Sequence, residues 1–211
     1  MRLFPVAALC CLALACGHGS RVRPTPRDQV AVEAELGGPL VKVAGMVIPV
    51  PLTAVGASYG IADRFDVSAH LHPTQALFGV GGLDVGSNFL AIEPDGAVPA
   101  LNLTGRLYGF TDFKTGFSPF LEAGATASYR IANRFSPFLN VSTLVQTNAA
   151  PLLAVGVGSE VRVGMSAVQA ELRWFSPNRN TTYNAAEWQS VGQQGALGIL
   201  VGGRVNFGGT P

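Results

Sequence analysis

One stretch of this 211-residue chain sets the pattern for most of the rest: LEAGATASYRIANRFSPFLNVSTLVQ, residues 121–146. Its first ten residues alternate between apolar and polar side chains, a short Ile-Ala-Asn-Arg-Phe sequence interrupts them, and a second alternating run follows. Alternation with period two is typical of a β-strand with two unlike faces. A polar interruption between two such runs is typical of a hairpin turn. The stretch therefore predicts strand, tight turn, strand.

The same turn occurs earlier in the chain, because YGIADRFDVS (59–68) closely matches YRIANRFSPF (129–138). Alternating runs like those on either side of it also recur, at 30–36, 101–108, 155–163, 168–174 and 197–207. Three further segments alternate less regularly: 52–61, 66–72 and 77–92. The sequence thus predicts an all-β, antiparallel, up-and-down barrel of about 10 strands. An eight-stranded barrel is the alternative if the irregular segments merge or fall in loops.

The composition narrows the class of protein. Charged residues make up only 13% of the chain, against about a quarter in ordinary soluble domains, while hydrophobic residues reach 48%. The 14 Lys and Arg against 13 Asp and Glu leave no basic surplus, which argues against a nucleic-acid partner. An apolar surrounding or an apolar interior is expected instead.

Two kinds of barrel fit the alternation. A soluble lipocalin-like barrel turns its apolar face inward, whereas a transmembrane β-barrel turns it toward lipid and keeps polar residues in the lumen. Polar faces rich in Gly, Ser, Thr, Glu and Arg favour the second, as do runs of the length that spans a membrane. Aromatic residues near the predicted strand ends suggest two interfacial girdles: Tyr59, Phe65, Tyr129, Phe135 and Phe207 on one side, and Phe110, Phe113, Phe117, Phe120 and Trp174 on the other.

The first residues predict export from the cytoplasm. Met1-Arg2 precedes an apolar run, Leu3–Ala15, which is typical of a secretory signal peptide and too short for a permanent transmembrane helix. The run ends LALAC (12–16), which resembles the bacterial lipobox and implies lipidation of Cys16. Ordinary cleavage after Ala15 or Gly17 is the alternative. No cysteine follows Cys16, so neither a disulfide nor a cysteine nucleophile is expected beyond it.

These segments give a simple domain organisation: a signal peptide (1–15), a flexible periplasmic tether (16–28), the barrel (29–208) and a C-terminal tail (209–211). The tether is inferred from its Pro, Gly and Arg content, as in RVRPTPRD (21–28). His18 belongs to the tether, and no role is expected for it.

Residues 29–208 resemble bacterial outer-membrane β-barrel proteins in two local motifs besides their pattern. One is the repeated YGIADRF turn, and the other is the ending GGRVNFG, which looks like the terminal-strand signal read by the barrel-assembly machinery. Gly202, Val205 and Phe207 match that signal, although a short tail follows the aromatic residue. The resemblance implies a bacterial outer-membrane location, outer-membrane lipid as the surroundings, and the assembly machinery as a partner during biogenesis.

The predicted lumen faces carry as many acids as bases: Glu33, Glu35, Glu122, Glu160 and Glu171 against Arg106, Arg130, Arg162, Arg173 and Arg204. Because burial of either charge alone is costly, these side chains are expected to pair. A barrel of this size has little interior space beyond its side chains. We therefore expect a mostly closed lumen and a structural or interaction role, with a narrow pore as the alternative.

One short motif offers reactive side chains. In SAHLH, Ser68, His70 and His72 alternate onto the polar face of one strand, where two histidines can share a metal or a serine can pair with a histidine base. A lipid-modifying enzyme is the corresponding alternative. Histidines near a barrel rim are more often simply hydrogen-bonded, so no catalytic residue, metal or cofactor is predicted.

The longest predicted outer loop, Ser176–Gln194, is where an extracellular or envelope protein partner would bind, since recognition tends to reside in long loops. The alternative is a solvated loop whose Trp188 rests in the membrane interface.

Overall fold

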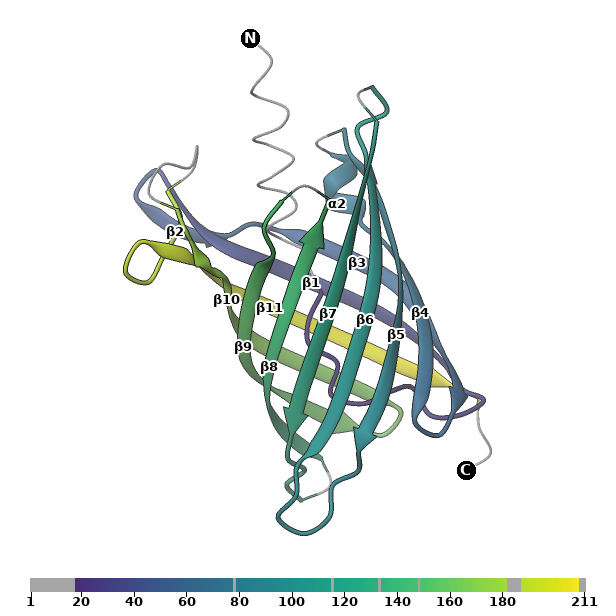
Figure 1. Ribbon diagram of the computed structural model, residues 1–211. Coiled ribbons are helices and arrows are strands. Elements are labelled where there is room, and N and C mark those ends of the chain that lie inside the picture. The colour runs from purple at the N-terminus through teal and green to yellow at the C-terminus, as the bar shows by residue number, and fades with distance from the viewer. Residues whose placement is uncertain are drawn as a thin grey trace.

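The computed structural model describes residues 18–77, 79–114, 116–132, 134–147, 149–181 and 187–208. It is a closed antiparallel barrel in which each barrel strand pairs with the next barrel strand along the chain (Figure 1). The last strand, β11, pairs with the first, β1. The barrel strands are β1 (Val30–Val43), β3 (Leu52–Ala62), β4 (Phe65–Leu71), β5 (Gly81–Ile92), β6 (Ala100–Thr111), β7 (Phe117–Ser128), β8 (Phe135–Gln146), β9 (Leu152–Val163), β10 (Ser166–Asn180) and β11 (Gln194–Phe207).

The expected 10-stranded barrel is confirmed, and the eight-stranded alternative is wrong. Every run that alternates in the sequence lies wholly or largely in a strand, including the three irregular ones. The prediction was least accurate at 77–92, because β5 begins only at Gly81 and the short helix α2 (Pro73–Ala76) precedes it. No helix among the described residues is long and apolar enough to cross a membrane.

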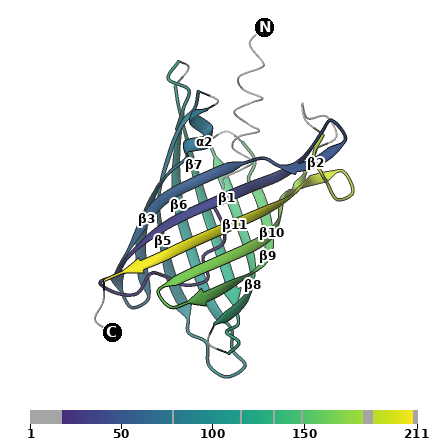
Figure 2. The same ribbon diagram turned by 180° about the vertical axis from the view of Figure 1, so that it is seen from behind.

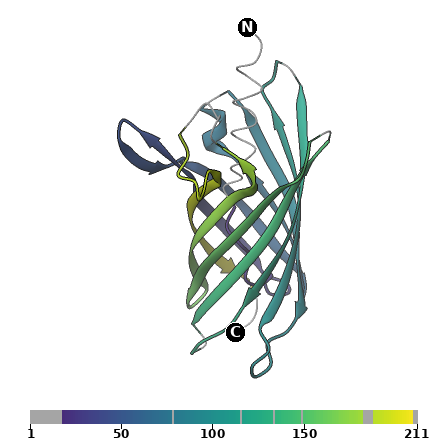
Figure 3. The ribbon, with the colours of Figure 1, turned by 60° about the vertical axis from the view of Figure 1, so that its left-hand side comes forward.

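The connections divide the barrel into two rims. The turn rim carries the short β3–β4 and β9–β10 turns and the β5–β6 and β7–β8 connections, together with the start of β1 and the end of β11. The loop rim carries the other connections, including the extra strand β2 (Met46–Pro49), which forms a hairpin with the far end of β1 and projects from the barrel (Figure 3). The described part of the β10–β11 loop lies against this hairpin, since Trp188 pairs with Val41 and Gln189 N donates to Leu40 O.

Side-chain exposure shows that the barrel is apolar outside and polar inside. Val157 on β9 and Leu121 on β7 are more than half exposed. The alternate positions are buried and include Glu160 and Arg173. This is the reverse of a soluble barrel, so the lipocalin-like alternative does not describe the structure.

The predicted aromatic girdles form only in part. Tyr59, Tyr129, Phe135 and Phe207 lie exposed toward the turn rim. On the other side, Phe113 and Phe117 are exposed, whereas Phe110 and Phe120 face inward and pack with Val80 and Tyr108 in a buried cluster. The prediction was wrong for these two phenylalanines because proximity to a strand end does not determine which face of the strand a residue occupies.

Residues 18–27 are called the luminal segment below: residues 18–25 run inside the barrel, whereas Pro26 and Arg27 are exposed where the segment enters. Figure 2 shows the start of the described chain, in purple, crossing behind the strands of the wall. His18, Ser20, Val22 and Thr25 are almost fully buried. The prediction of a flexible periplasmic tether is therefore wrong for this segment. The predicted signal peptide, Cys16 and the tail (209–211) lie outside the described residues.

Candidate functional site: a charged lumen filled by the N-terminal segment

The luminal segment enters at the turn rim. Asp28 N donates to Gly60 O at 2.9 Å, and Gly60 N donates to Gln29 O at 3.0 Å. A Cβ on Gly60 would lie 2.0 Å from Pro26 O, so only glycine allows this close approach of the segment to β3. Further into the barrel, Thr25 N donates to Asp66 Oδ2 at 2.6 Å. The Thr25 hydroxyl lies 2.6 Å from the hydroxyl of Ser58.

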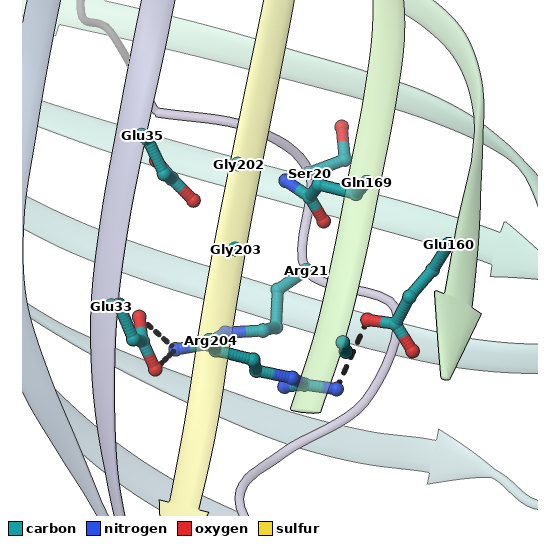
Figure 4. Close-up of a pocket in the computed structure, with 10 residues that line it drawn as sticks. Ser20, Arg21, Glu33, Glu35, Glu160, Gln169, Gly202, Gly203 and Arg204 are labelled. Carbon is teal, nitrogen blue, oxygen red and sulfur yellow. Dashed lines mark hydrogen bonds and ion pairs between the residues drawn. The ribbon is translucent and has the colours of Figure 1, made fainter. Parts of the chain in front are cut away.

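The middle of the segment is held by charged side chains of the seam between β1 and β11. Arg21 Nη2 lies 2.6 and 2.7 Å from the two carboxylate oxygens of Glu33 on β1. Arg204 on β11 donates to Arg23 O at 3.0 Å and pairs with Glu160 at 3.0 Å. Figure 4 shows the Arg21–Glu33 and Arg204–Glu160 contacts among the residues that line a remaining cavity. The cavity has a volume of about 20 Å³, which is room for about one water molecule.

Toward the loop rim, an ion pair of the wall holds the backbone of the segment. Glu171 and Arg173 on β10 pair at 2.7 Å. Glu171 accepts a hydrogen bond from Ser20 N at 2.8 Å, while Arg173 donates to His18 O at 2.8 Å and to Ser20 Oγ at 3.0 Å. The pair therefore satisfies backbone groups that burial would otherwise leave without partners.

The first described residue, His18, completes a cluster in which all 3 histidines of the chain surround Asp84. His18 Nε2 and His72 Nε2 each lie 2.8 Å from Asp84 Oδ2. His70 Nδ1 and Arg106 Nη1 each lie 3.1 Å from Asp84 Oδ1. Burial lowers the pKa of His72, which follows the end of β4.

Two more carboxylates surround this cluster. Glu35 Oε2 lies 2.9 Å from His18 Nδ1, and Glu33 Oε2 lies 3.1 Å from His70 Nε2. Both ring nitrogens of His18 and both of His70 therefore face carboxylate oxygens. Only His70 forms hydrogen bonds to carboxylates through both ring nitrogens, and a neutral imidazole carries only one N–H, so these two bonds together need one further proton.

Most of the predicted lumen charges do face the interior. Six are nearly fully buried: Glu33, Arg106, Glu160, Glu171, Arg173 and Arg204. Glu122 accepts a hydrogen bond from the Tyr108 hydroxyl, and Arg162 pairs with Glu160 at 2.7 Å. Arg130 differs: it follows the end of β7 at the turn rim and makes no ion pair within the described ranges. Burial and the nearby Arg162 lower the pKa of Arg130.

Four charged or titratable residues of the lumen were missed in the sequence: His18, Arg21, Asp66 and Asp84. The first two lie in the segment expected to be a tether. Asp66 and Asp84 lie in irregular strands, yet their register gives a signal, since Asp84 pairs directly with His70 across β4 and β5.

The SAHLH motif lies on β4 and just beyond it. His70 and His72 both reach Asp84, as described above. The Ser68 hydroxyl is buried and has no hydrogen-bond partner among the described residues. The serine–histidine pairing that would activate a nucleophile is thus not formed by Ser68 in this structure.

A closed 10-stranded barrel with an apolar exterior and a charged, filled lumen is a transmembrane β-barrel in architecture. No protein-family model matches the chain, and no curated relative matches it by sequence. Solved structures similar in fold include the translocator domain of the autotransporter NalP from Neisseria meningitidis, with 10% identity over 98% of this chain and 94% of that chain and a TM-score of 0.45. A designed transmembrane β-barrel has 13% identity over 87% of this chain and 99% of that one, with a TM-score of 0.36. OmpT of Vibrio cholerae has 8% identity over 85% and 96% of the two chains, with a TM-score of 0.34. The assignment to the class rests on the closure and polarity of the barrel itself.

Proposed function

We propose that this protein is an integral β-barrel of the bacterial outer membrane whose own N-terminal segment closes the lumen, and that its role is structural or interactive rather than conductive. One observation carries the proposal: the luminal segment is hydrogen-bonded to the wall along its length, from Asp66 near the turn rim to Asp84 inside. The apolar exterior supports the membrane location, because a continuous outer face of exposed Val and Leu side chains is favourable in contact with lipid and unfavourable in contact with water.

Conductance in planar lipid bilayers tests this proposal. The full chain, folded in detergent and reconstituted, should give no steady conductance. Deletion of residues 19–27 should leave a folded barrel that conducts, since the segment fills the space the deletion empties. Steady conductance of the full chain would refute closure and favour the narrow-pore alternative. A deletion variant that folds but stays closed would show that another element seals the barrel.

A matched control separates loss of the segment from a change elsewhere in the barrel. Replacement of residues 188–192 by a Gly-Ser linker of equal length alters the loop rim and leaves the luminal segment intact. This variant should remain non-conducting. Conductance from both variants would point to general damage of the barrel and contradict the proposal.

The biogenesis and anchoring of the barrel form part of the same proposal. Gly202, Val205 and Phe207 lie on β11, the strand that closes the barrel onto β1, with Val205 and Phe207 on its outer face. This position supports their role as the signal for the barrel-assembly machinery. Lipidation of Cys16 predicts that a fatty-acid probe labels the wild type but not Cys16→Ala. Labelling that persists in the variant would exclude it.

The interactive role is assigned to the extension at the loop rim, where the β1–β2 hairpin meets the described part of the β10–β11 loop. Lys42 on the hairpin pairs with Glu187 of the loop at 2.9 Å, and both are exposed. A photo-crosslinker at Glu187 in intact cells should capture an envelope or extracellular protein, whereas the same group at Asp95 on the turn rim should not capture that protein. Identical products from both positions would remove this assignment.

The proposed role is non-enzymatic. Its support is the environment of SAHLH: His70 is committed to two carboxylates and Ser68 is buried without a partner among the described residues. Unchanged lipid A mass on expression of the protein is the expected result. A mass change that is lost in Ser68→Ala would favour the lipid-modifying alternative.

A further inference from the structure

We infer that His18, His72 and Asp84 form a binding site for a transition-metal dication of the Zn²⁺ type, which would fasten the luminal segment to the barrel wall. One ligand atom from each residue lies within 4.8 Å of the other two. The two Nε2 atoms converge on the same oxygen, Asp84 Oδ2, at 2.8 Å each. Two imidazoles and one carboxylate are a donor set typical of zinc.

The contacts behind these ligands support the same inference. Glu35 Oε2 lies 2.9 Å from His18 Nδ1, although the two atoms do not form a hydrogen bond in this structure. A metal-bound histidine commonly donates its second N–H to a carboxylate, and Glu35 is close enough to accept it. With the proton on Nδ1, the lone pair of Nε2 points at an oxygen of Asp84. Two electron-rich atoms at hydrogen-bond distance require a cation or a second proton between them.

The charges around the cluster leave room for a cation. Three carboxylates (Glu33, Glu35 and Asp84) contact the histidines, while two guanidiniums (Arg21 and Arg106) pair with this group of acids. With neutral imidazoles, these five groups sum to one negative charge. A bound dication would change this sum to one positive charge and would place positive charge directly against the buried carboxylate of Asp84.

The site is enclosed, and the second ring nitrogen of His72 makes no hydrogen bond to the described residues. His18, His72 and Asp84 are each at most 3% exposed. His72 Nδ1 has no hydrogen-bond partner in the described part of the chain, so that no other acceptor holds its ring. Because His18 belongs to the luminal segment and the other two to the wall, the ion would join parts of the fold that are 54 or more residues apart in sequence, 18 against 72 and 84.

Metal binding to the intact protein tests the inference. The full chain, folded in detergent and stripped with a chelator, is titrated with Zn²⁺ by calorimetry, and Co²⁺ is used as a spectroscopic probe of ligand number. About one ion per chain is expected. His72→Ala and Asp84→Asn should each weaken binding at least tenfold, and Glu35→Gln should weaken it about 10- to 100-fold through loss of the contact to His18.

Two control variants make the result specific. Asp66→Asn changes an equally buried lumen carboxylate that holds the segment at Thr25, away from the cluster, and it should keep wild-type affinity. His70→Gln removes an imidazole that contacts Asp84 but is not in the ligand set, so the variant should still bind one ion per chain, with an affinity reduced as in Glu35→Gln.

Two results would overturn the inference: no stoichiometric binding by the wild type, or equal binding by the wild type, His72→Ala and Asp84→Asn. If Asp84→Asn does not fold, as judged by heat-modified gel mobility, His72→Gln decides, since it removes a ligand without stranding a charge. The conductance test does not depend on whether the protein binds Zn²⁺. Failure of the metal site is therefore distinguishable from failure of the proposed closure.

Discussion

The outer and inner faces of the barrel strands carry side chains in the same alternation, yet they differ in what each residue requires. On β9, Val155 and Val157 point outward, partly exposed, and any apolar side chain of similar shape would satisfy their surroundings. On the neighbouring β10, Glu171 and Arg173 point inward, and each has specific partners on the luminal segment. Pattern is sufficient for the exterior, whereas the lumen depends on individual contacts.

The largest effect is expected from breaking a luminal contact. Glu33→Ala removes the partner of Arg21 and also the acceptor of His70 and Ser58. Because an unpaired buried charge remains, the free energy of unfolding should fall by about 3–5 kcal/mol, as measured by urea unfolding in detergent. The matched control is Glu93→Ala, which breaks an ion pair of similar length to Arg64 at an exposed position. A loss there above about 1 kcal/mol, or no difference between the two variants, would contradict the comparison.

A charge on the outer face should cost somewhat less. Val157 lies near the middle of β9 and is 56% exposed. Val157→Arg should therefore destabilise the barrel in lipid by about 2–4 kcal/mol, whereas Val163→Arg at the strand end should cost about 0–1 kcal/mol. Unfolding measured in vesicles gives both values. Equal costs at the two positions would mean that the outer face does not contact hydrocarbon as proposed.

A smaller effect is expected where a luminal contact is neutral. Thr25→Val removes the hydroxyl that contacts Ser58 but keeps the backbone N–H that donates to Asp66. The loss of one neutral hydrogen bond should lower the unfolding free energy by about 0.5–1.5 kcal/mol. Thr25→Ser, which retains the hydroxyl, serves as the control and should stay within about 0.5 kcal/mol of wild type. A larger loss in Thr25→Ser would show that methyl packing, not hydrogen bonding, holds this point.

The sequence predicted the wall of the barrel well because each strand face reports its own environment through local alternation. It did not predict the luminal segment, since Pro, Gly and Arg in residues 18–27 have the same composition whether the chain is solvated or buried. What buries this segment are partners distant in sequence: Ser20 bonds to Glu171, 151 residues away, and His18 to Asp84, 66 residues away. Phe110 and Phe120 were misplaced for another reason: the face that a residue occupies depends on its position in the alternation along the strand, not on its residue type.

The position of the luminal segment has a consequence for assembly. The hydrogen-bond ladder that closes the ring joins the two ends of the barrel sequence, β1 and β11, with Glu33 opposite Arg204. The segment contacts both of these residues or their partners across that seam, through Arg21 to Glu33 and through Arg23 O to Arg204. A closed ring admits a chain only along its axis, so a segment that already lies between the two strands when the ring closes reaches the lumen without threading. It can therefore act as an internal template that brings the first and last strands into register, so that the same residues that fill the finished barrel also guide its closure.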